Sequence, residues 1–290
     1  MRAWRRRVLL GVPIALLAAA LPGRTGQQPS QPDRCGSCHA GVDRQAAESS
    51  PASLHAASVP CEACHGDATA HAASQGSVPP ALSAPRCTPC HERIAPHSRW
   101  KGSVHEKGGL QCASCHSIHG NAALAGAMVR PSLLSRPTES ETCFACHAAV
   151  RHAQTQRSTH LFRDELGRPK VECSDCHDVH GAAGGGEALL ARPSLNDVCY
   201  TCHDELRGPF LWEHPPAREN CAACHAPHGS NNAQLLTMRQ PMLCHTCHMG
   251  DVHVAAIGGP RTGWEMNRSC VNCHRRVHGS NHPSGITLQR

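Results

Sequence analysis

The cysteines constrain this chain more than any other feature, because all 20 occur in one repeated five-residue motif. The motif reads Cys-x-x-Cys-His and occurs ten times. Its cysteines are Cys35, Cys38, Cys61, Cys64, Cys87, Cys90, Cys112, Cys115, Cys143, Cys146, Cys173, Cys176, Cys199, Cys202, Cys221, Cys224, Cys244, Cys247, Cys270 and Cys273. Its histidines are His39, His65, His91, His116, His147, His177, His203, His225, His248 and His274. Any fold for this chain must place two thiols and one imidazole together ten times.

This motif is the attachment sequence of c-type haem, in which two thiols form thioethers with the haem vinyl groups and the adjacent His ligates iron. A disulfide scaffold is an alternative for an exported chain, but it needs no His after each second Cys. Zinc sites need four protein ligands each, and a thioredoxin-like site needs a βαβ context that none of the motifs has. We therefore predict ten covalently bound haem c groups, with the ten motif histidines as proximal iron ligands.

The rest of the composition offers little for an ordinary hydrophobic core, because only 3% of the residues are aromatic. Burial of apolar surface contributes about 25 cal/mol per Å² and must offset the loss of chain entropy. Between motifs, Pro and Gly bound short helical segments at most, such as 43–48 and 122–128. The predicted fold class is a multihaem cytochrome c, with mostly loops and short α-helices wrapped round a chain of ten haems, little or no β structure and an elongated shape.

The motifs form a longer repeat, because four of the five even-numbered ones continue to a second His followed by Gly, as in Cys-His-Ser-Ile-His119-Gly. The repeating unit is therefore predicted to be a pair of motifs. We expect one decahaem domain over 27–290, built of five paired repeats at 35–86, 87–142, 143–198, 199–243 and 244–290.

The N-terminus predicts export. A basic segment, 1–7, precedes an apolar run, 8–21, that ends in small residues and is shorter than the roughly 20 residues of a bilayer span. We interpret 1–26 as a secretory signal peptide with cleavage near 20–26, and we expect the mature chain in the periplasm. No later segment is apolar enough to span lipid, and Cys35 lacks the setting of a lipid-modified cysteine.

The other histidines suggest sixth ligands for the iron atoms, since each unit has one His between its two motifs and one after the second. These predicted distal ligands are His55, His71, His105, His119, His160, His180, His214, His228, His253 and His278. The alternative is that histidines merely decorate the surface. His253 also shares the position of His97 and His152 after an odd motif, so His282 is the substitute at the C-terminal end. A His three residues past its own motif is expected to serve the neighbouring haem.

Two histidines on each iron would close both axial positions, which is typical of an electron carrier rather than an enzyme. Met/His ligation throughout is excluded by the number of methionines, 6 in all. The formal charge of +6 does not indicate nucleic-acid binding, because several of the arginines lie in the predicted leader and haem propionates add negative charge.

The ten motifs, the repeated Cys-His-x-x-His-Gly, the segment Trp100-Lys-Gly-Ser-Val-His105-Glu-Lys and the terminus His278-Gly-Ser-Asn-His282-Pro-Ser-Gly resemble the periplasmic decahaem cytochromes of the DmsE/MtrA/PioA family. Each half is similar to the pentahaem donor cytochrome of nitrite reductase. The resemblance departs at Cys-His-Arg-Arg-Val-His278, which has one extra residue.

The resemblance implies an electron conduit between periplasmic carriers and the cell exterior, enclosed by a porin-like outer-membrane β-barrel. The implied acceptors or donors are extracellular metal, dimethyl sulfoxide or ferrous iron. The implied partners are that barrel, an extracellular cytochrome or terminal reductase, and periplasmic or inner-membrane quinol-linked cytochromes, with no nucleic acid and no direct lipid span. Two alternatives are a free periplasmic shuttle and a nitrite or hydroxylamine reductase, which would need an open iron.

Overall fold

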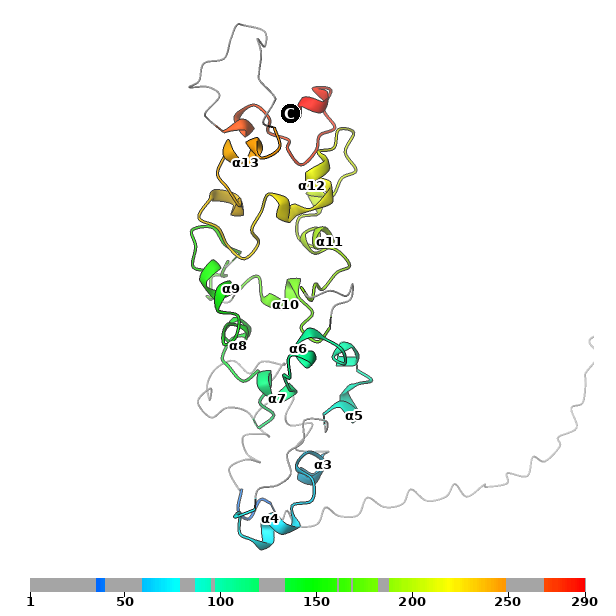
Figure 1. Cartoon of the computed structure of the whole chain (residues 1–290), viewed down its shortest axis with the longest axis vertical. Coiled ribbons are helices and arrows are strands. Elements are labelled where there is room, and N and C mark those ends of the chain that lie inside the picture. The colour runs from blue at the N-terminus through cyan, green and yellow to red at the C-terminus, as the bar shows by residue number, and fades with distance from the viewer. Residues whose placement is uncertain are drawn as a thin grey trace, which may run out of the picture.

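The computed structural model describes residues 35–39, 59–78, 87–94, 97–119, 134–160, 162–167, 169–181, 188–248 and 269–289. The predicted leader 1–26, the predicted helical segments 43–48 and 122–128, His55 and His253 lie outside these ranges. The described part of the chain is elongated, and it advances along the long axis from α3 and α4 at one end to α13 and the C-terminus at the other (Figure 1). Successive motifs therefore follow one another along the molecule.

The described elements are short helices, none longer than 6 residues. They are α3 (Cys61–His65), α4 (Thr69–Ala73), α5 (Thr88–His91), η2 (His97–Arg99), α6 (Val104–Lys107), α7 (Cys112–Cys115), α8 (Glu139–Phe144), α9 (Ala148–Ala153), α10 (Cys173–Cys176), α11 (Leu195–Cys199), η4 (Asp204–Leu206), α12 (Pro215–Glu219), η5 (Cys221–Ala223), η6 (Ala233–Leu235), α13 (Met242–His245), η7 (Cys270–Asn272) and η8 (Gly285–Thr287). The described residues form isolated β-bridges and no strand. The predicted fold class is confirmed in these respects. None of the described helices has the length and apolarity that crossing a bilayer requires.

Capping residues fix where these helices begin. The Ser103 side chain accepts the backbone N–H of Glu106 at the start of α6, and α8 begins with a capping box between Thr138 and Glu141. Few apolar side chains then stabilise the helices by packing. Leu189, Val198 and Leu288 are the buried hydrophobic residues of the described part, and no large side chain there is fully buried. The side chains of the described residues therefore supply almost no core of their own.

Each motif forms about one helical turn. The backbone N–H of its histidine donates to the backbone carbonyl of its first cysteine, at 2.8 Å in the motif of His39 and 3.0 Å in that of His225. The same bond is found in the other motifs for which it is described. Residues i, i+3 and i+4 lie on one face of such a turn. The two thiols and the imidazole therefore face the same side, as covalent attachment of one haem requires. No disulfide joins any of the 20 cysteines, so the disulfide-scaffold alternative finds no support here.

Side chains that lie just before the first motif of a unit accept hydrogen bonds from the helix of its second motif. Glu139 accepts the N–H of Ser174 at 2.6 Å, and Gln240 accepts the N–H of Val271 at 3.3 Å. Asn196, which is buried, accepts the N–H of Cys221 at 2.8 Å. Burial raises the pKa of Glu139, although its bonds from Ser174 act in the opposite direction. These contacts connect the two motifs of a unit. They use the N–H groups of the first turn of the second motif's helix, which have no acceptor within that helix.

Candidate haem sites

The structure places motif histidines opposite other histidines. Seven such pairs are found among the described residues, with ring centres 5.8–6.3 Å apart. They are His39 with His71, His65 with His119, His147 with His105, His116 with His180, His177 with His228, His248 with His214, and His225 with His278. All seven second members are predicted distal ligands.

This spacing fits two imidazoles on one metal ion. Metal–nitrogen bonds to imidazole are about 2.0–2.1 Å, so two nitrogens on opposite sides of a metal lie about 4 Å apart, and adding about 1 Å from each nitrogen to its ring centre gives about 6 Å. Together with the paired thiols on the same face, the donor set fits haem c. Bound there, haem would supply reversible one-electron chemistry at iron.

Hydrogen bonds at Nδ1 prepare these imidazoles to ligate through Nε2. Among the motif histidines, His177, His225 and His274 lie 2.7, 2.8 and 2.5 Å from the carbonyls of Ala188, Gln234 and Thr287. Among the predicted distal ligands, His71, His105, His160 and His214 lie 2.7, 3.1, 2.9 and 2.9 Å from the carbonyls of Val78, Val179, Pro227 and Val277. A carbonyl only accepts, so Nδ1 donates its proton and Nε2 keeps a free lone pair.

Burial also favours the neutral form of three of the predicted distal ligands. Desolvation lowers the pKa of His180, His228 and His278, and neighbouring histidines lower it further. Neutral imidazole is the form that binds metal.

Two rules describe which unit supplies which histidine. The histidine between two motifs faces the first motif of the next unit, as His105 faces His147. From the second unit onwards, the histidine after the second motif faces the second motif of the preceding unit, as His228 faces His177. The latter therefore faces a motif two places earlier in the sequence, not the neighbouring motif as expected. In the first unit, His71 instead faces His39 of its own unit. Consecutive units exchange ligands in both directions.

The exchange has a backbone cause. Ser158 and Ser230 donate to each other's carbonyls at 2.8 and 2.9 Å, which joins the loop before His160 to the loop after His228. Trp212 of the fourth unit and Ser280 of the fifth make the same reciprocal pair of backbone hydrogen bonds, both at 2.9 Å. Each pair brings both exchanging loops side by side.

Three motif histidines are not among the seven pairs. His91 contacts His97 edge-on, with ring centres 5.4 Å apart, and the exchange rule assigns it His55, which lies outside the described residues. No ring contact joins His203 to His160, although the rule pairs them; Nδ1 of His203 lies 3.7 Å from a Glu205 oxygen instead.

The third is His274, near the C-terminus, for which the sequence offers His253 and His282. His253 lies outside the described residues. His282 accepts the N–H of Ser284 on Nδ1 at 3.1 Å, the reverse of the arrangement in the paired histidines. A neutral imidazole that accepts on Nδ1 carries its proton on Nε2, so His282 is not prepared for ligation in this conformation.

Sequence reasoning missed the residues that orient the motif histidines. Leu189, Leu235 and Leu288 have left-handed backbones, with φ of 49°, 58° and 51°. The carbonyl that receives the imidazole proton belongs to the residue just before each of them. The signal was present as repeated Leu-Leu pairs at 189–190 and 235–236 and as the Leu of the C-terminal Thr-Leu.

Thiols of successive motifs also lie close together. Cys143 donates to the sulfur of Cys173, and this bond raises the pKa of Cys143 and lowers that of Cys173 to about 7. Burial, with Cys112 beside it, raises the pKa of Cys87 to about 11. Burial acts the same way on Cys244, next to Cys270. Attachment sites that follow one another in sequence are therefore neighbours in space.

Comparisons with known proteins agree with this arrangement. Residues 103–152, 169–208 and 214–253 match the family described as "Doubled CXXCH motif", and 19–66 match "Cytochrome c554 and c-prime". The doubled-motif matches pair each even motif with the following odd one, so their register is offset by one motif from the five repeats above. The match at 103–152 encloses both His105 and His147.

Over 195 residues the chain is 38% identical to the multiheme cytochrome MtrA of Shewanella baltica (strain OS185). The alignment covers 64% of this chain and 54% of that relative, so the match spans about half of the relative's length. Motifs, facing histidines and relative agree that the chain is a multihaem c-type cytochrome similar to MtrA.

Proposed function

We propose that the chain is a ten-haem wire that carries electrons between periplasmic carriers and the cell exterior through an outer-membrane barrel partner. One observation carries this proposal: facing histidine pairs and adjoining attachment sites follow one another in sequence order along an elongated molecule (Figure 1). Electrons placed on one end would meet an unbroken series of haems to the other.

The number of ten follows from ten complete motifs and 20 cysteines, each with the thiols and histidine of one attachment site. Intact mass of the mature protein tests it. Ten haem increments are expected, and eight or fewer would contradict the proposal.

The facing pairs also favour a carrier over an enzyme. Where two histidines hold one iron from opposite sides, no coordination position remains for a substrate. The alternative of a nitrite or hydroxylamine reductase would require an open iron, and none of the ten motifs has the Cys-x-x-Cys-Lys form that often marks one.

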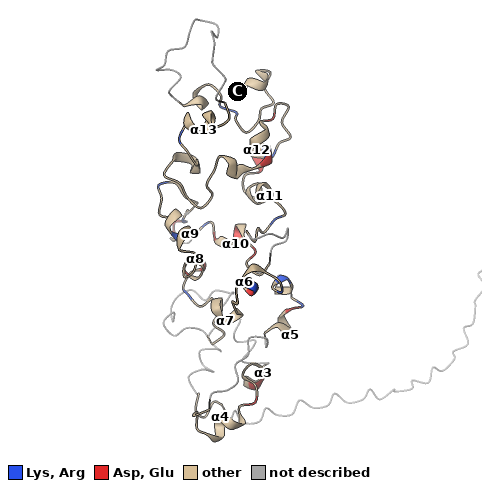
Figure 2. Cartoon of the chain, in the orientation of Figure 1, with Lys and Arg blue, Asp and Glu red and all other residues tan. Residues whose placement is uncertain are grey.

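The surface chemistry supports an enclosing barrel. Among the described residues, acidic and basic side chains are dispersed along the molecule (Figure 2), and haem propionates would add further charge. Charged groups facing hydrocarbon cost several kcal/mol each without polar partners. A conduit with this surface therefore needs a polar protein wall around it, such as the lumen of a barrel. A periplasmic location with the outer membrane at one end completes the proposal.

Reconstitution provides the test. Liposomes containing the cytochrome and its barrel should pass electrons from an external donor to a trapped redox dye, whereas liposomes with either protein alone should not. A matched variant, Cys143→Ala with Cys146→Ala, removes one central haem and should stop transfer while the complex still assembles. Recovery of the native protein wholly as a free periplasmic monomer would contradict the conduit and support the shuttle.

A further inference from the structure

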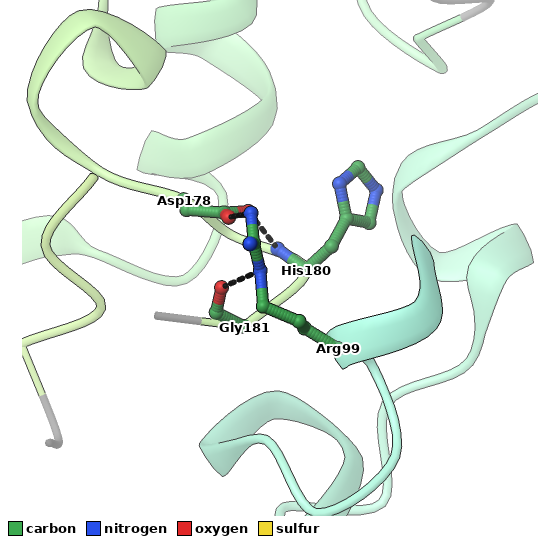
Figure 3. Close-up of polar contacts among 4 residues, drawn as sticks. All are labelled: Arg99, Asp178, His180 and Gly181. Atoms are coloured by element: carbon green, nitrogen blue, oxygen red, sulfur yellow. Dashed lines mark hydrogen bonds and ion pairs between the residues drawn. The ribbon is translucent and has the colours of Figure 1, made fainter. Parts of the chain in front are cut away.

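A charged pair joins two units at the junction that precedes His180. Arg99 ends η2, between the third and fourth motifs, and Asp178 directly follows the sixth motif. The Arg99 guanidinium donates from Nη2 to Oδ2 of Asp178 at 2.5 Å and from Nε to the carbonyl of Gly181 at 3.1 Å (Figure 3). One arginine thus holds both ends of the loop 178–181, which carries His180.

The same loop is fixed from two further directions. The second carboxylate oxygen of Asp178 accepts the backbone N–H of His180 at 3.3 Å (Figure 3). Gly181, with φ +145°, lies against the backbone of Arg99, where a Cβ atom would be 2.2 Å from the Arg99 carbonyl oxygen. Between these anchors, the His180 ring lies 6.0 Å from His116 with an interplanar angle of 11°, the most nearly parallel of the facing pairs.

This charged contact is particular to one junction. The residues that follow the other even-numbered motifs are Gly66, Ser117, Ala226 and Arg275, none of them acidic. The two later junctions use the backbone pairs of Ser158 with Ser230 and Trp212 with Ser280. The side chain of Asp178 is 12% exposed and that of Arg99 45%, so their charges are only partly screened by water.

The geometry points to Arg99 and Asp178 as positioning residues that orient the His180 imidazole and set the reduction potential of the haem bound at Cys112 and Cys115. This inference rests on the proposed ligation of that haem by His180. Reduction of a haem iron removes one positive charge, so a nearby cation favours the reduced state and a nearby anion favours the oxidised state. The two charges offset each other while both are present.

Neutralising one charge at a time tests the inference on the holoprotein. Arg99→Gln leaves the Asp178 carboxylate uncompensated and should lower the potential of one haem. Asp178→Asn leaves the guanidinium uncompensated and should raise the potential of the same haem. The double variant should return towards the native value. A role limited to holding the loop would shift both single variants in the same direction, and that result would overturn the assignment of the potential to these two charges.

Electron paramagnetic resonance gives a second readout, because freeing the His180 ring should change the low-spin signal of one haem in both single variants. Arg163→Gln is the matched control: it removes the same charge from an arginine that donates to the carbonyl of Gly167 in its own loop at 2.7 Å, and it should leave that haem unchanged. His180→Ala distinguishes the ligation of iron by His180 from the positioning of His180 by Arg99 and Asp178. If it yields one high-spin haem while the Arg99 and Asp178 variants shift no potential, the positioning role is wrong. If it leaves every haem low-spin, the ligation by His180 is wrong as well.

Discussion

The imidazoles of His105 and His147 face each other at 6.2 Å with their planes crossed at 73°, whereas the six other facing pairs lie within 24° of parallel. The angle between two axial imidazole planes determines how the iron d orbitals split. Crossed planes give a strongly anisotropic low-spin ferric signal, and parallel planes give a more rhombic one. The haem at Cys143 and Cys146 is therefore expected to differ spectroscopically from most of the others.

Replacing His105 by Met should abolish one strongly anisotropic signal and raise the potential of one haem, because a thioether ligand favours ferrous iron. The haem count should stay the same, since the cysteines hold the haem covalently. Resonance spectra and a redox titration of the purified protein measure both effects.

His152→Met is the matched control for this experiment, because His152 is exposed and makes no ring contact with another described imidazole. It should leave the spectrum and the titration unchanged. An unaltered anisotropic signal in His105→Met would show that another residue ligates the iron of the fifth motif.

Asn196→Ala should lower the stability of the fourth unit. The Asn196 amide donates to the carbonyls of Ala217 and Arg218 at 3.3 and 2.8 Å and accepts the N–H of Cys221. Each buried polar group left without a partner costs about 1–3 kcal/mol. A lower midpoint of denaturant unfolding is expected for Asn196→Ala. Asn196→Asp keeps the acceptor oxygen, so its midpoint should lie between those of Asn196→Ala and the native protein. The exposed Asn272, changed to Ala, serves as the control; equal midpoints for both Ala variants would contradict the proposed role of Asn196.

The sequence was sufficient to predict the composition of the haem sites. Cys-x-x-Cys-His defines a local turn, so its chemistry can be recognised without knowledge of the fold, and low aromatic content indicates a chain without a core. The identity of the facing partner could not be obtained in this way. Whether His105 faces the fourth or the fifth motif depends on contacts between loops of different units, and such long-range contacts leave no spacing signal within one unit.

The structure also explains the glycine that follows the predicted distal ligand after the second motif in the later units. A Cβ atom at Gly229, with φ +151°, would lie 1.9 Å from the carbonyl oxygen of Ala153, and one at Gly279 would lie 2.2 Å from the Phe210 ring. The repeated His-Gly was visible in the sequence, but its reason is the close approach of the preceding unit, which only the fold reveals.

Gly229→Ala should therefore separate the third and fourth units locally and loosen His228 from the haem at Cys173 and Cys176. Part of the effect is the backbone strain of a non-glycine residue at positive φ, about 1 kcal/mol or more. Gly167→Ala controls for that part, because Gly167 also has positive φ, +76°, but has no atom near a Cβ. A high-spin haem fraction is expected in Gly229→Ala alone, measured by visible and resonance spectra. Equal spectra for both variants would show that strain, not the contact, matters.

Removal of haem should unfold the protein. The described part buries three apolar side chains, Leu189, Val198 and Leu288, and burying such a side chain contributes about 1.5–3 kcal/mol. Ordering the backbone of a single residue costs about 1–2 kcal/mol, so these side chains can offset the ordering of only a few residues. The haem macrocycles, held between the facing histidines, must supply the remaining apolar contact. After chemical cleavage of the thioethers, we expect far-ultraviolet circular dichroism without a cooperative thermal transition and rapid digestion by protease, while the haem-loaded protein resists both. A sharp transition in the haem-free chain would mean that the protein has a core of its own.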